Sequence, residues 1–257
     1  MMESEQSHIE HLGLKNLARN SLSKIGLNLT YALTPGISAL GLNIFRDGRP
    51  GPFRYRSLYA LDFALGFQPK TVLDVGSGGG RHAQMFVESG CDVLCVDYGT
   101  SVYAQSAELK GFTVVNTDFN QFTSESKFDL VWASHVLEHQ RNVGMFIERL
   151  IDCCAEDGMV CITVPDPHRN LWGGHVTLWT PGMLAYNVVL CGVDLSNAKF
   201  VRGSAEFSLF FAPKRITLPD SLTFDYGDLD KLAQYLPQGW CENSDPWKVR
   251  YDSTAGG

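Results

Sequence analysis

Between residues 70 and 213 the sequence alternates short apolar runs with helical stretches, and this order restricts the possible folds more than any other feature. The runs expected to be parallel strands are TVLDV (71–75), DVLCVD (92–97), FTVVNTD (112–118), FDLVWAS (128–134) and GMVCITVP (158–165). Strands that alternate with crossover helices form a parallel sheet. Two later runs, AKFVRG (198–203) and EFSLFFAP (206–213), lie too close together for a crossover helix, so we expect an antiparallel pair.

The sequence therefore predicts an α/β fold with a Rossmann-like, seven-stranded, mostly parallel sheet that closes with an antiparallel β-hairpin. Leucines at helical spacing before this region predict a helical N-terminal cap or lid over 1–67. The α/β domain itself is expected to span 68–213. A C-terminal extension, 214–257, contains one short helical candidate at 228–236.

The acidic composition disfavours one class of partner. The 257 residues carry a formal net charge of −7, whereas a protein that grips nucleic-acid phosphates needs a basic face. Seven cysteines form no CxxC pair, and several lie in apolar runs. This pattern is typical of buried thiols in a reducing compartment, so we expect a cytoplasmic protein.

One uncharged stretch, residues 25–45, is long enough in principle to cross a bilayer. Pro35 and Gly36 interrupt it in the middle, and several polar residues lie within it. We expect two short covering helices or a substrate lid rather than a transmembrane span. Loose contact with a membrane surface is the alternative. The acidic, polar start of the chain does not resemble a secretory signal.

The first predicted strand ends in the glycine-rich sequence DVGSGGG, with Asp74, Gly76, Gly78 and Gly80. Glycines allow a sharp turn from strand to helix and let a ligand approach the bare backbone. The following helix then offers unpaired N–H groups to a polar ligand. A nicotinamide fingerprint would need a glycine at position 81, which is Arg81, so a nucleotide-dependent oxidoreductase is disfavoured.

Two carboxylates follow at the ends of the next strands. Asp97 ends the second strand, where a carboxylate can accept hydrogen bonds from both hydroxyls of a ribose. Asp118 ends the third and is followed by Phe119, a pair suited to an adenine ring and its exocyclic amine. The alternatives are an N-cap for the next helix at Asp97 and an ordinary loop residue at Asp118.

These residues resemble the class I S-adenosylmethionine-dependent methyltransferases, in particular the type-11 and type-23 groups. The matching segments are LDVGSGGG (73–80), VLCVD (93–97), VVNTDF (114–119), FDLVWASHVLEH (128–139), DGMVCITVP (157–165) and GGHVTLWTPGMLAYNVVLCGVD (173–194). The closing hairpin matches as well. The resemblance implies that 68–213 is the S-adenosylmethionine-binding domain and that S-adenosylhomocysteine is the product.

The resemblance also implies roles for individual residues around the cofactor. It assigns ten to this site: Asp74, Gly76, Ser77, Gly78, Asp97, Tyr98, Asp118, Phe119, Ser134 and His135. Gly76, Ser77 and Gly78 would line the methionine part, and Asp74 would orient the loop or meet the amino group. Asp97 would hold the ribose and Asp118 the adenine. Arg54 or Arg56 would meet the cofactor carboxylate.

Four histidines follow predicted strands where the active cleft should open: His135, His139, His168 and His175. A hydroxyl nucleophile benefits from a general base, and histidine suits that role near neutral pH. We expect the catalytic candidates to be His139, His168 and His175, with Glu138 and Asp166 as lesser candidates, and structural roles remain the alternative for each. His135 and His139 are four residues apart, but no third metal ligand is evident, so no metal site is predicted.

The acceptor is expected to be a small molecule or a glycan- or lipid-linked compound, methylated at oxygen. The motif of amino-methylating DNA enzymes, N/D-P-P-Y/F, is replaced here by ASHVLEH after the fourth strand. Aromatic residues around 171–179 suit an organic acceptor, although core packing would explain them equally well. The alternative to an active enzyme is a catalytically inert partner or regulatory subunit, against which the intact glycines, Asp97 and Asp118 argue.

Overall fold

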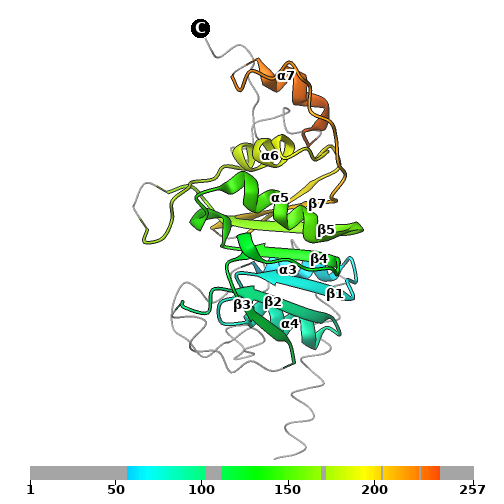
Figure 1. Cartoon of the computed structure of the whole chain (residues 1–257), viewed down its shortest axis with the longest axis vertical. Helices are drawn as coiled ribbons and strands as arrows, with labels where there is room; N and C mark the ends of the chain where they lie inside the picture. Colours follow the sequence, from blue (N-terminus) through cyan, green and yellow to red (C-terminus); the bar gives the residue numbers. More distant parts are fainter. Residues whose placement is uncertain (1–56, 102–110, 169–171, 204, 226, 238–257) are drawn as a thin grey trace, which may run out of the picture.

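The computed structural model describes residues 57–101, 111–168, 172–203, 205–225 and 227–237 (Figure 1). Most of the expected N-terminal cap, including the uncharged stretch 25–45 and the candidates Arg54 and Arg56, lies outside these residues. Residues 226 and 238–257 of the C-terminal extension also lie outside them.

The described chain forms one seven-stranded sheet with the order β3-β2-β1-β4-β5-β7-β6. Its strands are β1 (Thr71–Val75), β2 (Asp92–Asp97), β3 (Thr113–Asn116), β4 (Phe128–Ser134), β5 (Cys154–Pro165), β6 (Lys199–Arg202) and β7 (Glu206–Phe211). The first five strands pair in parallel, and β7 pairs antiparallel with both β5 and β6. The predicted sheet with its closing hairpin is confirmed.

Helices cover both faces of the sheet. They are α3 (Leu58–Leu65), α4 (Arg81–Glu88), α5 (Val143–Cys153), α6 (Pro181–Leu190) and, in the C-terminal extension, α7 (Asp228–Leu232). Side chains of β1 alternate between two hydrophobic cores, because Val72 packs with residues of α3 and α4 whereas Leu73 packs with residues of α5 and α6. The expected helix at 228–236 forms as α7 followed by a 3₁₀ turn (Ala233–Tyr235).

Local sequence explains where some of these helices begin. Thr180 precedes α6, and its side-chain oxygen accepts a hydrogen bond from the backbone N–H of Met183. Pro181 occupies the first helical position, where its missing N–H leaves no hydrogen bond unmade. Helix α4 begins after Gly80, whose φ of 67° is favourable for glycine, so the strand-to-helix turn requires this residue type.

Two expectations about the chain can be compared with the described residues. Six cysteines (Cys91, Cys95, Cys153, Cys154, Cys161 and Cys191) are buried and form no disulfide in this part of the chain. Among the helices described, none has both the length and the apolar character required to cross a membrane.

Candidate functional site at the carboxyl ends of the strands

The glycine loop, defined here as Gly76–Gly80, leaves β1 at the carboxyl edge of the sheet. Its backbone is tied to the next strand by a 2.7 Å hydrogen bond from the N–H of Gly76 to the carbonyl of Val96. Gly76 has a φ of 71°, and a Cβ placed there would lie 2.3 Å from Cγ2 of Val136. The loop therefore packs against the segment after β4 so closely that only glycine fits.

This crowding predicts a difference between two glycines that share a positive φ. Gly90 has a φ of 92° and no atom within 4 Å of an added Cβ. Gly90→Ala should therefore lower the free energy of unfolding by about 1–2 kcal/mol, because only the backbone conformation becomes unfavourable. Gly76→Ala should lower it by about 1–3 kcal/mol more, because its methyl group would collide with Val136. Urea unfolding of both variants measures the difference, and equal losses would contradict the close packing.

Asp97, the last residue of β2, holds the glycine loop from the side. Its Oδ2 accepts a 2.8 Å hydrogen bond from the N–H of Gly78, and its Oδ1 accepts one of 2.8 Å from the N–H of Gly99. Hydrogen bonds to a carboxylate are stronger than those between neutral groups. Each oxygen still has lone pairs that can accept further hydrogen bonds at this half-buried position.

Asp74 lies on β1 beneath the glycine loop and is almost completely buried. Its Oδ2 has no hydrogen-bond partner among the described residues. Burial raises the pKa of Asp74 to about 7, the negative charge of Asp97 adds to this effect, and a hydrogen bond from the backbone of Ala83 opposes it. Asp74 therefore provides a buried acidic oxygen with unused hydrogen-bonding capacity, two residues before the loop begins.

This raised pKa predicts how an Asp74→Asn variant responds to pH. Because the native pKa lies above the ordinary value of 3.8, the carboxyl stabilises the fold when protonated and loses that contribution as the pH rises toward 7. Asp74→Asn should therefore be more stable than the unmodified chain at pH 8, with the advantage shrinking to nothing near pH 4. Urea unfolding of the ligand-free chains at both pH values measures this. A constant difference would contradict it.

The end of β3 brings Asp118 and Tyr98 together. Asp118 caps a 3₁₀ turn (Phe119–Gln121) by accepting a 2.9 Å hydrogen bond from the N–H of Asn120. Burial and a hydrogen bond to Asp118 raise the pKa of the otherwise exposed Tyr98. Phe119 is only 5% exposed and packs edge-on against Phe146 in the core. Tyr98 and Asp118 are thus the accessible groups of this trio.

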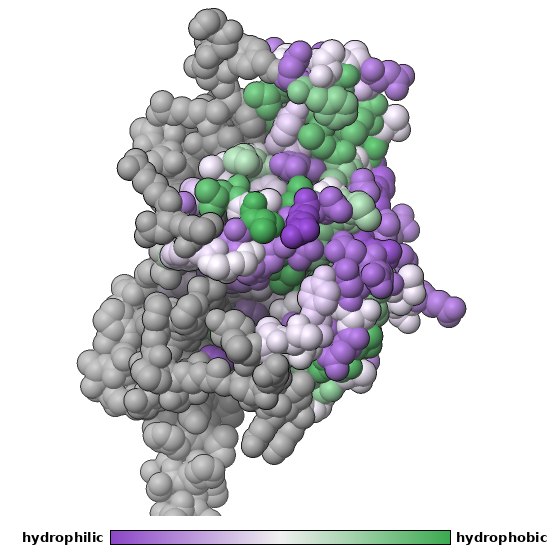
Figure 2. All heavy atoms as spheres, turned by 60° about the vertical axis from the view of Figure 1, so that its left-hand side comes forward, coloured by the Kyte–Doolittle hydropathy of each residue, from purple (hydrophilic) through white to green (hydrophobic). Residues whose placement is uncertain are grey.

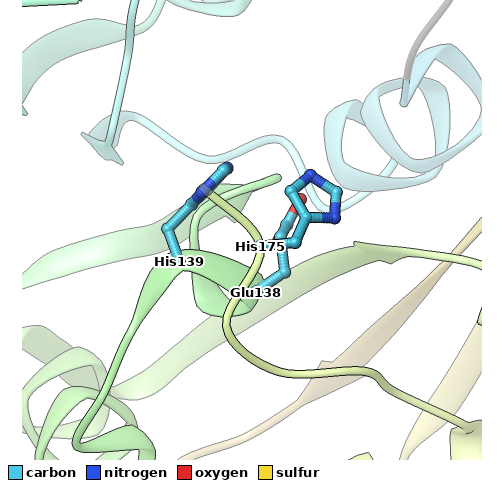
Figure 3. A group of neighbouring side chains, drawn as sticks. All are labelled: Glu138, His139 and His175. Carbon is cyan, nitrogen blue, oxygen red and sulfur yellow. The ribbon is translucent and has the colours of Figure 1, made fainter. Parts of the chain in front are cut away.

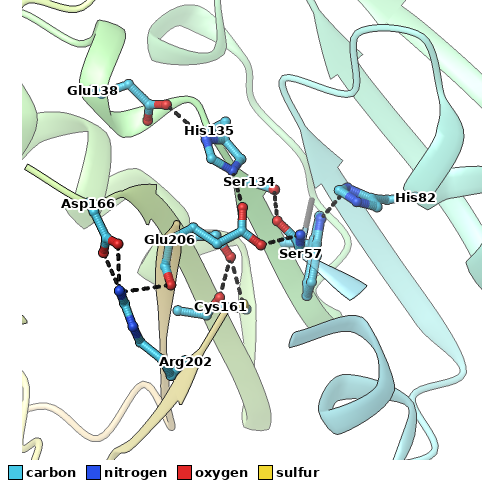
Figure 4. Close-up of polar contacts among 12 residues, drawn as sticks. Ser57, His82, Ser134, His135, Glu138, Cys161, Asp166, Arg202 and Glu206 are labelled. Carbon is cyan, nitrogen blue, oxygen red and sulfur yellow. Dashed lines mark hydrogen bonds and ion pairs between the residues drawn. The ribbon is translucent and has the colours of Figure 1, made fainter. Parts of the chain in front are cut away.

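The segment after β4 carries a buried polar network, which Figure 4 shows between the sheet and the start of α3. His135 lies at its centre: Nε2 is 2.6 Å from Oε2 of Glu206, and Nδ1 is 3.2 Å from Oε1 of Glu138. The other oxygen of Glu206 accepts a hydrogen bond from the N–H of Ser57, whose hydroxyl meets that of Ser134 at 2.7 Å. The network thus joins β4, β7 and the residue before α3.

The charge of His135 follows from its two neighbours. Burial alone would lower the pKa of His135, but the hydrogen bonds to Glu138 and Glu206 outweigh burial and raise it. The residue also has a φ of 57°, a conformation that non-glycine residues seldom adopt. Such strain persists only where the surroundings enforce it, so the two carboxylates hold His135 firmly in place.

The other three histidines gather beside this network. His139 follows β4, and its Nδ1 donates a 2.7 Å hydrogen bond to the carbonyl of Gly174 in the loop after β5. The ring centroid of His139 lies 4.9 Å from that of His175, and the rings of His168 and Trp172 stack at 3.8 Å. Burial lowers the pKa of His175. The structure therefore brings together all three catalytic candidates of the sequence.

The loop that carries His175 also exposes large apolar side chains. Trp172, Val176 and Leu178 are exposed, as is Met183 in the first turn of α6. Figure 2 shows separate apolar patches on the molecular face that comes forward from the left of Figure 1, with hydrophilic side chains between them. Exposed apolar groups beside polar ones are characteristic of sites for organic ligands.

Sequence reasoning missed two members of the polar network. Glu206 begins a wholly buried strand whose other residues are uncharged, and a lone charge in such a run is a signal that could have identified it. Nothing in the local sequence marks Ser57. The lesser candidate Asp166 forms an ion pair with Arg202. This ion pair is a structural role for Asp166 that needs no part in catalysis.

The residues around the glycine loop fit S-adenosylmethionine. A loop with four glycines and Ser77 lies beside Asp97, whose carboxylate has spare acceptor capacity, and the buried oxygen of Asp74 has no partner among the described residues. A cofactor with ribose hydroxyls and a positively charged amino acid end supplies the hydrogen-bond donors that these carboxylates lack.

Comparison with known proteins agrees with this fit. The model of a methyltransferase-domain family matches residues 53–198, more than half of the chain. A ubiquinone biosynthesis O-methyltransferase of Pseudomonas fluorescens is 25% identical over 193 residues, which are 69% of this chain and 77% of that protein. One of the same name from Azorhizobium caulinodans is 34% identical over 101 residues, 36% of this chain and only 39% of that protein.

Solved structures share the fold. A Burkholderia thailandensis 1,6-didemethyltoxoflavin-N1-methyltransferase with bound S-adenosylhomocysteine aligns with a TM-score of 0.51 at 19% identity, covering 75% of this chain and 92% of that one. A protein of Pyrococcus horikoshii aligns with a TM-score of 0.51 at 14% identity, covering 66% and 95%. With its glycine loop, strand order and family match, the chain belongs to the class I S-adenosylmethionine-dependent methyltransferases.

Proposed function

We propose that this methyltransferase transfers the methyl group to a hydroxyl oxygen of a small-molecule or of a glycan- or lipid-linked acceptor, by in-line displacement. The observation that carries the proposal is the group of Glu138, His139, His168 and His175 at the carboxyl edge of the sheet, beside the exposed apolar residues of 172–178. The relatives named O-methyltransferases of ubiquinone biosynthesis support oxygen as the acceptor atom. Buried free thiols support a cytoplasmic setting.

The chemistry of the reaction separates binding of the cofactor from activation of the acceptor. When bound, S-adenosylmethionine supplies a methyl group that its sulfonium has already activated. The glycine loop, Asp74, Asp97, Tyr98 and Asp118 bind and orient the cofactor in this proposal. Alignment of two reactants can lower a barrier by up to about 7–11 kcal/mol.

The acceptor hydroxyl must also lose a proton, and a positioned base contributes about 10²–10⁴-fold to such a step. His139, His168 and His175 are the candidates for this role, because all three lie together where the loop after β5 meets the turn after β4. The apolar residues Trp172, Val176 and Leu178 would contact the body of the acceptor. An organic acceptor with an apolar part and a reactive hydroxyl fits this surface.

The experiment uses S-adenosylmethionine with an isotopically labelled methyl group and the full-length chain. The acceptor panel pairs each phenol, catechol, sugar and lipid-linked phenol with the matching amine, and mass spectrometry locates the label. We expect label on hydroxyl oxygen in at least one pair, with a preference for acceptors that carry an apolar group. Label on the amines alone would contradict the proposal, as would the absence of transfer to every hydroxyl.

A further inference from the structure

We propose that Glu138, His139 and His175 form a binding site for one divalent transition-metal ion such as Zn²⁺. The sequence analysis paired His135 with His139, whereas this site combines Glu138 and His139 with a third ligand, His175, from the loop after β5. In the fold, one possible ligand atom from each of the three side chains lies within 4.8 Å of the other two (Figure 3). We call these three residues the Glu–His–His cluster.

The hydrogen bond of His139 decides which of its nitrogens is available. Nδ1 carries the proton because it donates to the carbonyl of Gly174, so Nε2 keeps a lone pair that can bind a metal. Metal-binding histidines usually donate their other ring N–H in this way, to a backbone carbonyl or a carboxylate. Gly174 has a φ of 83°, and an added Cβ would lie 3.0 Å from Nδ1 of His139. A glycine at this position therefore allows the close approach of its carbonyl to the ring.

Glu138 supplies a second, independent observation. Its side chain is fully buried, and Oε1 is engaged by His135. Its Oε2 has no hydrogen-bond partner among the described residues, and the same is true of the buried Nδ1 of His175. Leaving a buried carboxylate oxygen without a partner is costly, and such a group is stabilised by a cation. The cluster thus contains two buried ligand-type atoms whose capacity the described protein does not use.

The polar network holds the Glu138 ligand in place. Glu138 and Glu206 are both buried and both contact His135. Because Oε1 of Glu138 is engaged by His135, its Oε2 is the oxygen left to bind a metal ion. His135 and Glu206 would then act as positioning residues that orient the Glu138 ligand.

The donor set indicates the metal and leaves room for an acceptor. Two imidazoles and one carboxylate are a common ligand set of catalytic zinc, which keeps a fourth position open. Resting on the proposed function, the acceptor hydroxyl would occupy this position, where a metal lowers the pKa of a bound hydroxyl. The hydroxyl releases its proton to a base such as His168 or to solvent. The oxygen then takes the methyl group, and sulfur keeps the electron pair of the broken C–S bond.

The test measures metal binding with neither cofactor nor acceptor present. Full-length chain without an affinity tag is stripped with a chelator and titrated calorimetrically with Zn²⁺. We expect about one site per chain, with binding weakened at least about 100-fold in Glu138→Gln, His139→Ala and His175→Ala. Glu138→Gln keeps the shape of the side chain, so its thermal unfolding should show an intact fold.

The matched control is His168→Gln, which changes a histidine of the same group that lies outside the Glu–His–His cluster. This variant should bind Zn²⁺ within about threefold of the unmodified chain. Absence of Zn²⁺ binding, or unchanged binding in Glu138→Gln and His175→Ala, would overturn the proposal. Loss of binding in His168→Gln would overturn the assigned ligands.

The acceptor panel separates this proposal from the proposed function. Zn²⁺ binding without methylation of any hydroxyl would contradict the O-methyltransferase proposal alone. Hydroxyl methylation that proceeds at full rate in chelator-treated protein, with no Zn²⁺ binding, would contradict the metal site alone.

Discussion

Replacing Asp97 by alanine is expected to weaken the binding of S-adenosylhomocysteine by at least about 100-fold. Asp97 accepts hydrogen bonds from the N–H groups of Gly78 and Gly99, so its loss releases the glycine loop and removes the expected ribose acceptor at once. A hydrogen bond to a charged group contributes about 1.5–3 kcal/mol, and each 1.4 kcal/mol is tenfold in affinity. Isothermal titration calorimetry measures the change.

Asp92 provides the matched control because it begins the strand that Asp97 ends and its side chain is exposed. Asp92→Ala should bind the ligand as the unmodified chain does, within about threefold. Thermal unfolding of both variants shows whether the loss reflects the site or the fold. If a folded Asp97→Ala chain bound S-adenosylhomocysteine as tightly as the unmodified chain, Asp97 would have no role in the cofactor site.

Replacing Glu206 by alanine should cause the largest loss of stability, about 3–5 kcal/mol. The side chain is buried, and its two oxygens accept hydrogen bonds from the N–H of Ser57 and from Nε2 of His135. Removing it takes this acceptor away from both buried donors, and His135 loses one of the carboxylates that favour its charged form. Urea unfolding near pH 7 measures the change in the free energy of unfolding.

Two further variants test the cause of this loss. Glu206→Gln keeps an acceptor for Ser57 and a polar group beside His135, so it should lose less stability than the alanine variant. Glu156→Ala removes an exposed carboxylate on β5 and should change stability by less than about 0.5 kcal/mol. If Glu206→Ala were as stable as Glu156→Ala, the polar network would have no structural role.

Most of the fold was predictable because the strand signals are local. The predicted boundaries of β1, β2 and β4 agree with the structure, since each is a short apolar run flanked by turns. The start of β5 was predicted wrongly: the strand begins at Cys154, four residues early, across a register shift between Phe128 and Leu130 of β4. Exposed charged residues at 156–157 concealed this part, because a strand outside the core has no apolar pattern.

The candidate site was predictable only where it depends on single segments. The glycine loop and Asp97 come from adjacent elements whose geometry the strand–turn–helix pattern determines. The meeting of His175 with Glu138, and of Glu206 with His135, depends on how distant segments pack. Spacing along the chain does not encode these contacts. The third possible metal ligand was therefore missed, although each histidine had been noted.

We expect S-adenosylmethionine to bind at the carboxyl edge of this sheet. The most direct test is a calorimetric titration of the unmodified full-length chain with S-adenosylhomocysteine, with NAD⁺ as the comparison ligand. We predict saturable, micromolar binding of S-adenosylhomocysteine and no heat with NAD⁺. Heat with NAD⁺ alone, or with neither ligand, would contradict binding of S-adenosylmethionine at this edge.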